Sequence, residues 1–214
     1  MKHVYLIRHG QTEWNAEGRW QGQLDVPLSG EGRLQARALA HELAERGIQA
    51  VFASDLMRAA ETARILAGQA SAPLYLDARL RELHLGVFQG LTHAEIRARY
   101  PEHDEGMKRD YLHYVIPGGE SRLTMQDRMH QAWLEILARP EEGPVAIVSH
   151  GGSIRILLLR ILDPAEHEKV MTLQITNTAC TLLEVPPAGP ARMLVAADFS
   201  HLERRAADRG ENQL

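Results

Sequence analysis

The 214-residue sequence predicts an α/β fold: a three-layer αβα sandwich with a mostly parallel central sheet and a small helical cap insertion. Two observations lead to this prediction. Short, nearly unbroken apolar runs, typical of strands buried on both faces, alternate with segments of helical periodicity. One long excursion, residues 91–143, separates the third apolar run from the fourth and has helical patterns instead of a strand.

The first apolar run, residues 4–7, is bounded by polar residues and predicts a buried strand. After a loop, Ser29 is placed to cap a helix that continues through Leu43 and stops before Gly47. Residues 48–53 form the second apolar run and the second predicted strand.

The next predicted helix covers residues 57–67, with Gly68 placed to end it, and residues 74–76 form a short third strand. The cap excursion then begins with Thr92 and Glu95 at the spacing of a capping box, so a helix is expected there.

Pro101 is expected to stop that first cap helix, and residues 101–119 have no clear periodicity. A second cap helix is predicted over residues 124–138, where apolar side chains recur four apart. These side chains, which we interpret as core, are Met125, Met129, Trp133 and Leu137.

The last third of the chain returns to alternation, with a fourth strand at residues 145–148 and a helix at 153–162. Residues 180–185 and 193–197 predict a late strand pair, and an edge strand at 180–185 could support a homodimer. We expect residues 1–214 to form a single domain whose charged tail, residues 203–214, is frayed.

Composition excludes several classes of protein. Twenty-four basic and 28 acidic residues leave a net charge of −4, which does not suit a nucleic-acid-binding protein. The single cysteine, Cys180, cannot form an internal disulfide. The N-terminal apolar run is too short for a signal peptide and no apolar stretch is long enough for a membrane span. The sequence therefore predicts a cytoplasmic protein with no membrane partner.

Polar side chains follow three of the predicted strands at the points where the strands end. Arg8 and His9 follow the first strand, Arg58 lies one turn into the helix after the second, and His150 and Gly151 follow the fourth. Because ligands of open α/β sheets bind beyond the carboxyl ends of the strands, we expect these residues at one rim. Guanidinium groups match phosphate oxygens, and neutral imidazole can hold a transferred phosphoryl group. The pattern predicts a phosphoryl-transfer pocket without a metal ion or other cofactor.

A leaving alcohol needs a proton donor, and Glu82 is the candidate because it lies just after the third predicted strand. Taken alone, Glu82 also fits a surface ion pair with Arg79 or Arg81, which would have little consequence.

Longer motifs around these residues resemble the histidine phosphatase (phosphoglycerate mutase-like) superfamily, in that family's order and over nearly the whole chain. The segments are residues 8–15 (RHGQTEWN), 19–29 (RWQGQLDVPLS), 54–63 (SDLMRAAETA), 81–90 (RELHLGVFQG), 117–121 (PGGES), 149–151 (SHG) and 198–202 (DFSHL).

The resemblance implies a role for each matching residue. His9 would be the phosphorylated nucleophile and Glu82 the proton donor. The remaining positions would bind the phosphoryl group or the rest of a small phosphorylated substrate, and they are Arg8, Asn15, Gln21, Gly22, Arg58, His150 and Gly151.

The pattern is most similar to the broad-specificity phosphatases of the superfamily, so the expected function is hydrolysis of small phosphomonoesters through a phosphohistidine. A cofactor-dependent phosphoglycerate mutase is the alternative. The glycolytic mutases typically carry a tyrosine where Leu85 stands, and a pair of adjacent arginines for which only Lys108 and Arg109 could substitute. A non-catalytic module that binds phosphorylated ligands is a third hypothesis, although His9 and Glu82 are both present. Substrate specificity is expected to reside in residues 91–143.

Overall fold

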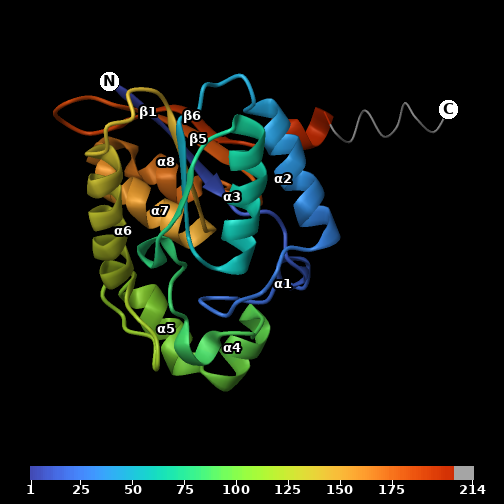
Figure 1. Ribbon diagram of the computed structural model, residues 1–214. Helices are drawn as coiled ribbons and strands as arrows, with labels where there is room; N and C mark the ends of the chain where they lie inside the picture. The colour runs from blue at the N-terminus through green and yellow to red at the C-terminus, as the bar shows by residue number, and fades with distance from the viewer. Residues whose placement is uncertain (205–214) are drawn as a thin grey trace.

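The computed structural model describes residues 1–204 and has a six-stranded sheet at its centre, in the order β3-β2-β4-β1-β5-β6 (Figure 1). The strands are β1 (Lys2–Arg8), β2 (Ala50–Ala53), β3 (Leu74–Leu76), β4 (Val145–Ser149), β5 (Cys180–Val185) and β6 (Arg192–Asp198). Strands β1 to β4 pair in parallel, whereas β5 is antiparallel to β1, and β6 to β5. The mostly parallel sheet is therefore confirmed.

Helices cover both faces of this sheet, which confirms the three-layer αβα prediction. The α-helices of the described chain are α1 (Glu13–Ala16), α2 (Gly30–Glu42), α3 (Met57–Ala70), α4 (His93–Arg99), α5 (Pro101–Arg109), α6 (Arg122–Leu137), α7 (Gly151–Ile161) and α8 (His167–Thr172). Short 3-10 turns are η1 (Ala78–Leu80), η2 (Gly86–Phe88) and η3 (Pro164–Glu166). Helices α2 and α3 lie on one face, and α6 and α7 on the other (Figure 1).

Alternation along β1 divides the core into two halves. Val4 and Leu6 join the cluster that packs under α6 and α7, whereas Tyr5 and Ile7 join the cluster that packs under α2 and α3. All four side chains are buried because the central strand has apolar layers on both faces. This packing fixes β1 in register and so fixes the position of the residues that follow it.

Several predicted boundaries were wrong. Helix α3 continues through Gly68 to Ala70, and Ser71 takes the left-handed conformation with φ of 51°. A glycine weakens a helix interior by only about 1 kcal/mol, so it does not end a helix that packs well. Helix α7 begins at Gly151, two residues earlier than predicted, and His150 is its N-cap residue.

The cap excursion contains one helix that the periodicity did not predict. Thr92 and Glu95 form the expected capping box of α4, which ends at Arg99. Pro101 stops α4 and also starts α5, since a proline at the first position of a helix loses no hydrogen bond. Helix α6 is capped by Ser121 and begins at Arg122.

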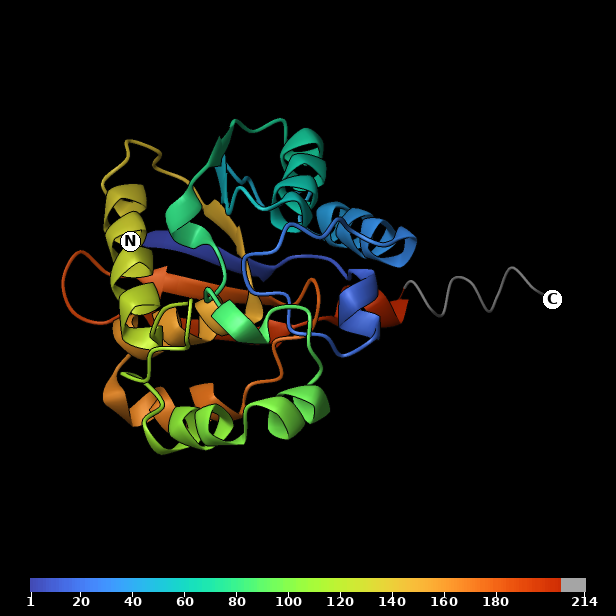
Figure 2. The ribbon, with the colours of Figure 1, turned by 90° about the horizontal axis from the view of Figure 1, so that it is seen from below.

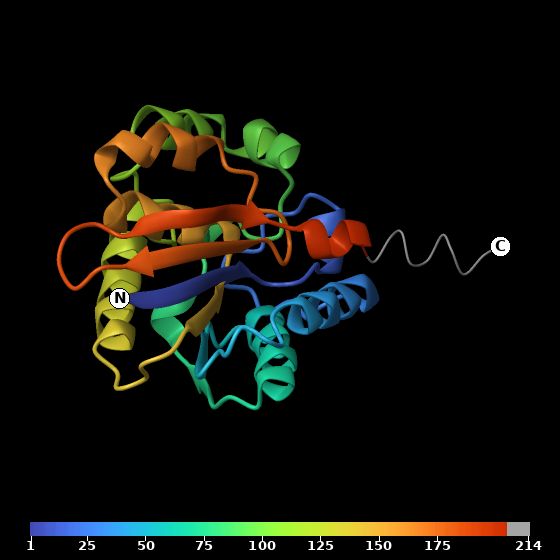
Figure 3. The same cartoon turned by 90° about the horizontal axis from the view of Figure 1, so that it is seen from above.

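The predicted edge strand at residues 180–185 is not an edge. This segment forms β5, which pairs with β1 on one side and with β6 on the other (Figure 3). The exposed β6 occupies that edge of the sheet instead. Residues 203–214 were expected to fray. Within that tail, Arg204 donates a hydrogen bond to Glu42 at 2.7 Å. Residues 205–214 lie outside the described part of the chain.

The sheet order places the carboxyl ends of β2, β4 and β1 side by side. Helices α4 and α5 lie beyond that edge (Figure 1), and the view from below shows them on the side of α7 and α8 (Figure 2).

Within residues 1–204, no helix combines the length and the apolar character needed to cross a membrane.

Candidate active site

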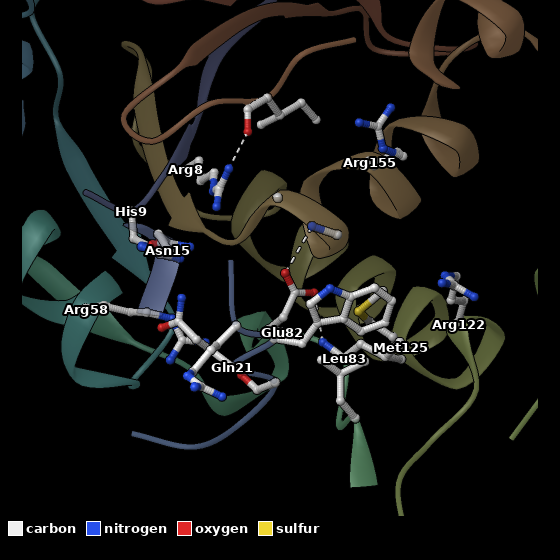
Figure 4. A pocket seen from close by; sticks show the side chains of 17 residues that line it. Arg8, His9, Asn15, Gln21, Arg58, Glu82, Leu83, Arg122, Met125 and Arg155 are labelled. Carbon is white, nitrogen blue, oxygen red and sulfur yellow. Dashed lines mark hydrogen bonds between the residues drawn. The ribbon is translucent and has the colours of Figure 1, made fainter. Parts of the chain in front are cut away.

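One pocket of about 370 Å³ lies at the carboxyl edge of the sheet (Figure 4). Of the residues expected at the site, those that line it are Arg8, His9, Asn15, Gln21, Gly22, Arg58, Glu82 and Gly151. His150 does not line the pocket; it is buried beside His9, with ring centroids 5.1 Å apart. The structure therefore brings the predicted set together and places His150 behind the nucleophile candidate.

One ring nitrogen of His9, Nε2, keeps a free lone pair for a ligand in the pocket. Its Nδ1 lies 2.6 Å from the carbonyl oxygen of Gly10, so Nδ1 carries the proton and donates it, leaving Nε2 unprotonated. Burial, followed by the charges of Arg58 and Arg8, holds the pKa of His9 well below 6.5. The loop is held in turn by the Gly10 N–H, which donates to Thr62 at 3.0 Å. His9 is thus a neutral imidazole in a fixed orientation.

His150 is also held neutral. Its Nε2 lies 2.9 Å from the hydroxyl of Ser54 at the end of β2, and Nδ1 has no hydrogen-bond partner among the described residues. Burial, with a smaller contribution from Arg58, lowers the pKa of His150 well below 6.5. Ser54 was part of the family motif, but its contact with His150 was not predicted.

Arg58 is a buried cation and Arg8 a half-buried one, and neither is bonded to a carboxylate of the described chain. Arg58 is 1 % exposed and donates to the carbonyls of Gly22 at 2.7 Å and Leu24 at 2.9 Å. Arg8 donates to the carbonyl of Ile175 at 2.8 Å, and the Nε of each arginine has no hydrogen-bond partner within residues 1–204. Burial lowers both pKa values, that of Arg58 to about 10. Because buried charges are stabilised by a partner of opposite sign, this end of the pocket favours an anion.

Asn15 and the adjacent residues Gln21 and Gly22 complete this end of the pocket. The side-chain oxygen of Asn15 accepts from the Thr12 N–H at 3.1 Å and from Asn177 at 3.2 Å, which leaves the amide nitrogen available to a ligand. Gly22 has φ of +55°, and a side chain there would meet Gln89 at 2.5 Å. Glycine therefore suits this left-handed turn, whose carbonyl accepts from Arg58.

Three donors hold the Glu82 carboxylate. The N–H groups of Leu83 and Gly152 lie 2.9 and 3.0 Å from its oxygens, and the Ser153 hydroxyl lies 3.1 Å away. Gly152 is in the first turn of α7, whose positive end favours negative charge. A carboxyl oxygen of Glu82 therefore accepts one of the free N–H groups at the start of α7.

The surface ion-pair interpretation of Glu82 is wrong. Arg81 pairs with Asp55, and Arg79 pairs with Asp77 and Glu135. Glu82 itself forms no ion pair with another residue of the described chain and points into the pocket (Figure 4).

A half-buried ion pair, Arg128 and Glu120, holds the backbone at Glu82 and was not singled out from the sequence. Arg128 donates to the carbonyls of Arg79, Arg81 and Glu82 at 2.8, 2.7 and 2.9 Å. Its charge is balanced by Glu120, 2.6 Å away. Since Glu120 lies in the segment PGGES, the family motif was the available signal for half of this pair.

The outer wall of the pocket was also not predicted residue by residue. It consists of Arg19, Trp20, Leu83, Leu85, Arg122, Met125, Arg155 and Ile175. Met125, interpreted as core, is indeed 1 % exposed, yet its side chain also contacts the pocket. From the excursion 91–143, only Arg122 and Met125 line the pocket within the described chain, and α4 and α5 contribute nothing.

A three-layer α/β fold with a histidine, two arginines and a glutamate at its strand ends is typical of enzymes that transfer phosphoryl groups. The chain belongs to the histidine phosphatase superfamily, because the model of branch 1 of that family matches residues 4–197.

Similar proteins carry both phosphatase and mutase names. A probable phosphoglycerate mutase GpmB of Enterobacter sp. (strain 638) is 37% identical over 215 residues, covering 97% of this chain and 98% of the relative. A glucosyl-3-phosphoglycerate phosphatase of Mycolicibacterium vanbaalenii is 41% identical over 172 residues, covering 76% and 75%. The solved structure of a mycobacterial glucosyl-3-phosphoglycerate phosphatase with VO3 has a TM-score of 0.80 and 35% identity, covering 91% and 98%.

Proposed function

We propose that the protein hydrolyses small phosphomonoesters through a phosphohistidine at His9, without a metal ion. The observation that carries the proposal is the neutral His9 ring, with Nδ1–H committed to Gly10 and Nε2 free, beside the two arginines Arg8 and Arg58. A nucleophilic nitrogen and a site for a phosphate group are thereby adjacent.

In the first step, Nε2 of His9 attacks phosphorus and forms an N–P bond while the ester P–O bond breaks. Arg8 and Arg58 neutralise the phosphoryl oxygens during this transfer, and Asn15 donates its amide N–H to them. Glu82, in its protonated form, gives its proton to the leaving oxygen, so the product is a free alcohol.

In the second step, water attacks the phosphohistidine and Glu82 takes the proton that the water loses. The N–P bond breaks, inorganic phosphate leaves, and His9 and Glu82 return to their starting protonation states. His150, buried behind His9 and neutral, positions the nucleophile in this proposal.

Two features of the pocket support a phosphatase over a mutase. Leu85, which stands where the mutases have a tyrosine, lines the pocket as an apolar wall. Lys108 and Arg109, the only adjacent basic pair of the excursion, lie on α5, and neither lines the pocket in the described chain. Lys108 is instead paired with Asp104 at 2.7 Å and Glu105 at 3.0 Å.

The test is hydrolysis of phenyl phosphate in the presence of a metal chelator. We expect the wild-type protein to be active and His9→Ala to be inactive, while His41→Ala, an exposed histidine of α2, retains wild-type activity. Rapid denaturation of a reaction with radiolabelled substrate should trap an acid-labile phosphoryl group on the wild type and none on His9→Ala.

The other hypotheses predict different outcomes. Interconversion of 2- and 3-phosphoglycerate without net phosphate release would identify a mutase. Binding of phosphorylated ligands with neither hydrolysis nor exchange would identify a binding module. Activity that the chelator abolishes would overturn the metal-free mechanism.

A further inference from the structure

The side-chain amide of Asn177 joins two residues that the proposed mechanism uses. Its Nδ2 donates to the carbonyl of His9 at 3.1 Å and to the side-chain oxygen of Asn15 at 3.2 Å. His9 and Asn15 line the pocket next to each other (Figure 4), whereas Asn177 is not among the described residues that line it. One nitrogen outside the pocket therefore links the nucleophile candidate to a residue expected to bind the phosphoryl group.

The amide groups of Asn177 and Asn15 each have one orientation that fits their partners. Asn177 faces two acceptors, so its nitrogen and not its oxygen points towards them. The side-chain oxygen of Asn15 also accepts from the Thr12 N–H at 3.1 Å, and a reversed amide would set its NH2 group against this donor. The NH2 group of Asn15 is therefore directed away from these donors and is available to a ligand in the pocket.

The residue after Asn177 holds the same stretch of main chain. The Thr178 N–H donates to the carbonyls of Arg8 at 3.1 Å and His9 at 3.3 Å. The His9 carbonyl thus accepts from both Asn177 and Thr178, and both donors come from the segment that connects α8 to β5. Since the His9 ring is fixed to the Gly10 carbonyl, these bonds to the main chain also set where Nε2 of His9 lies.

Thr178 has a backbone conformation that its own side chain disfavours. It is fully buried and has φ of 59°, in the left-handed region that a β-branched residue rarely adopts. Such a conformation persists only where the surrounding structure determines it, and it is concentrated at functional sites. In this conformation the Thr178 N–H reaches the carbonyls of Arg8 and His9.

A buried histidine of the motif at residues 198–202 holds the side chain of Thr178. The Thr178 hydroxyl donates its one proton to the Asn177 carbonyl at 2.7 Å, so it accepts from Nε2 of His201, 2.9 Å away. His201 is 4 % exposed. The motif is therefore connected to the pocket through Thr178, although none of its residues lines the pocket in the described chain.

We propose that Asn177 is a positioning residue that sets the spacing between Nε2 of His9 and the amide group of Asn15. Thr178 and His201 hold Asn177 in place. The inference rests on the proposed phosphatase function and adds to it a residue that does not touch the substrate. Both His9 and Asn15 must meet the same phosphoryl group, and a misplacement of about 1 Å costs about 100-fold in rate. Asn177 should therefore affect phosphoryl transfer more than binding.

The experiment compares Asn177→Ala, Asn15→Ala and the double variant with phenyl phosphate as substrate, and with vanadate and inorganic phosphate as inhibitors. Vanadate takes a five-coordinate geometry like that of the transferred phosphoryl group, so its inhibition constant reports the alignment of His9 and Asn15. The inhibition constant of phosphate reports binding of the anion alone. Neither constant depends on the fraction of folded protein, so a merely structural loss leaves both unchanged. Gln174→Ala, which removes an exposed amide of the same connecting segment, is the matched control.

We expect Asn177→Ala to lower kcat by about 10- to 100-fold with little change in KM. The inhibition constant of vanadate should rise by a similar factor, and that of phosphate by less than about threefold. In the Asn15→Ala background the loss caused by Asn177→Ala should be at least about twofold smaller, because the two residues are in contact. His201→Ala should cause a smaller loss of the same kind, and His201→Gln, which keeps a nitrogen donor, should restore part of it. Gln174→Ala should match the wild type in every measurement.

The proposal is overturned if Asn177→Ala hydrolyses phenyl phosphate at the wild-type rate. It is equally overturned if kcat falls while the two inhibition constants stay unchanged or rise together, or if the losses from Asn177→Ala and Asn15→Ala multiply. If Asn177→Ala does not fold, the inhibition constants are measured in Asn177→Ser, where an unchanged ratio overturns the proposal. Failure of the wild type to hydrolyse phenyl phosphate, in contrast, would count against the phosphatase function itself.

Discussion

Replacing Gly152 with alanine is expected to impair Glu82 without unfolding the protein. Gly152 is the second residue of α7, and a Cβ built there lies 2.6 Å from one oxygen of Glu82 and 3.2 Å from its carboxyl carbon. Ordinary contacts begin at 3.4 Å, so the carboxyl oxygen must retreat by about 0.8 Å. That shift also stretches the 3.0 Å hydrogen bond from the Gly152 N–H.

The size of the effect follows from the displacement. A misplacement of about 1 Å lowers catalysis by about 100-fold, and general acid catalysis as a whole contributes about 100- to 10,000-fold. We therefore expect kcat to fall by about 10- to 100-fold in Gly152→Ala. Because Glu82 is a flexible side chain and alanine favours a helix, the free energy of unfolding should change by less than about 1 kcal/mol.

Two esters make the assay specific for the proton donor. The loss in kcat should be large for an alkyl phosphate, whose alkoxide leaves poorly without a proton, and small for p-nitrophenyl phosphate. Gly68→Ala is the control, since it adds the same methyl group to helix α3 where no atom lies within 4 Å. Equal losses with both esters, or no loss at all, would refute the role of Glu82 as proton donor.

Two further predictions concern pH and the support of Glu82. His9 and His150 have folded pKa values well below 6.5, so the unfolded chain takes up protons that the folded protein excludes, and stability is lost as pH falls below that value. The free energy of unfolding, measured with urea, should drop by roughly 1 kcal/mol per histidine between pH 7 and 5.5, and a flat profile would show that both rings take up protons in the folded protein as they do in the unfolded chain. Arg128→Lys, which cannot reach three carbonyls and Glu120 together, should lower kcat by about tenfold with little change in KM; an unchanged kcat would remove Arg128 from the positioning of Glu82.

The inner end of the pocket could be predicted because it depends on short-range rules. Buried apolar runs identify parallel strands, and parallel strands deliver the residues that follow them to one edge. That reasoning placed Arg8, His9, Arg58 and Glu82 in the same pocket without any knowledge of the strand order. It also placed His150 beside His9, though behind the pocket wall.

The outer end could not be predicted because its residues are selected by long-range packing. Arg128 reaches carbonyls up to 49 positions away, and carbonyls have no side-chain signature in a sequence. Arg122 is one of seven basic residues of the excursion, and no local pattern marks it as the one that lines the pocket. The continuation of α3 through Gly68 has the same origin, since tertiary packing outweighs the low helix propensity of glycine, which costs about 1 kcal/mol relative to alanine.

One physical cause, burial at the carboxyl edge of the sheet, accounts for both halves of the proposed chemistry. Burial removes the proton that would block Nε2 of His9, because a charged imidazole is poorly solvated there. The same burial leaves Arg8 and Arg58 with unpaired donors, so the environment that makes the histidine nucleophilic also attracts the phosphate that it attacks. Exposed arginines would bind phosphate weakly, and an exposed histidine would be partly protonated near neutral pH. The site therefore requires the three-layer sandwich around it, and the few side chains of the motif would not suffice alone.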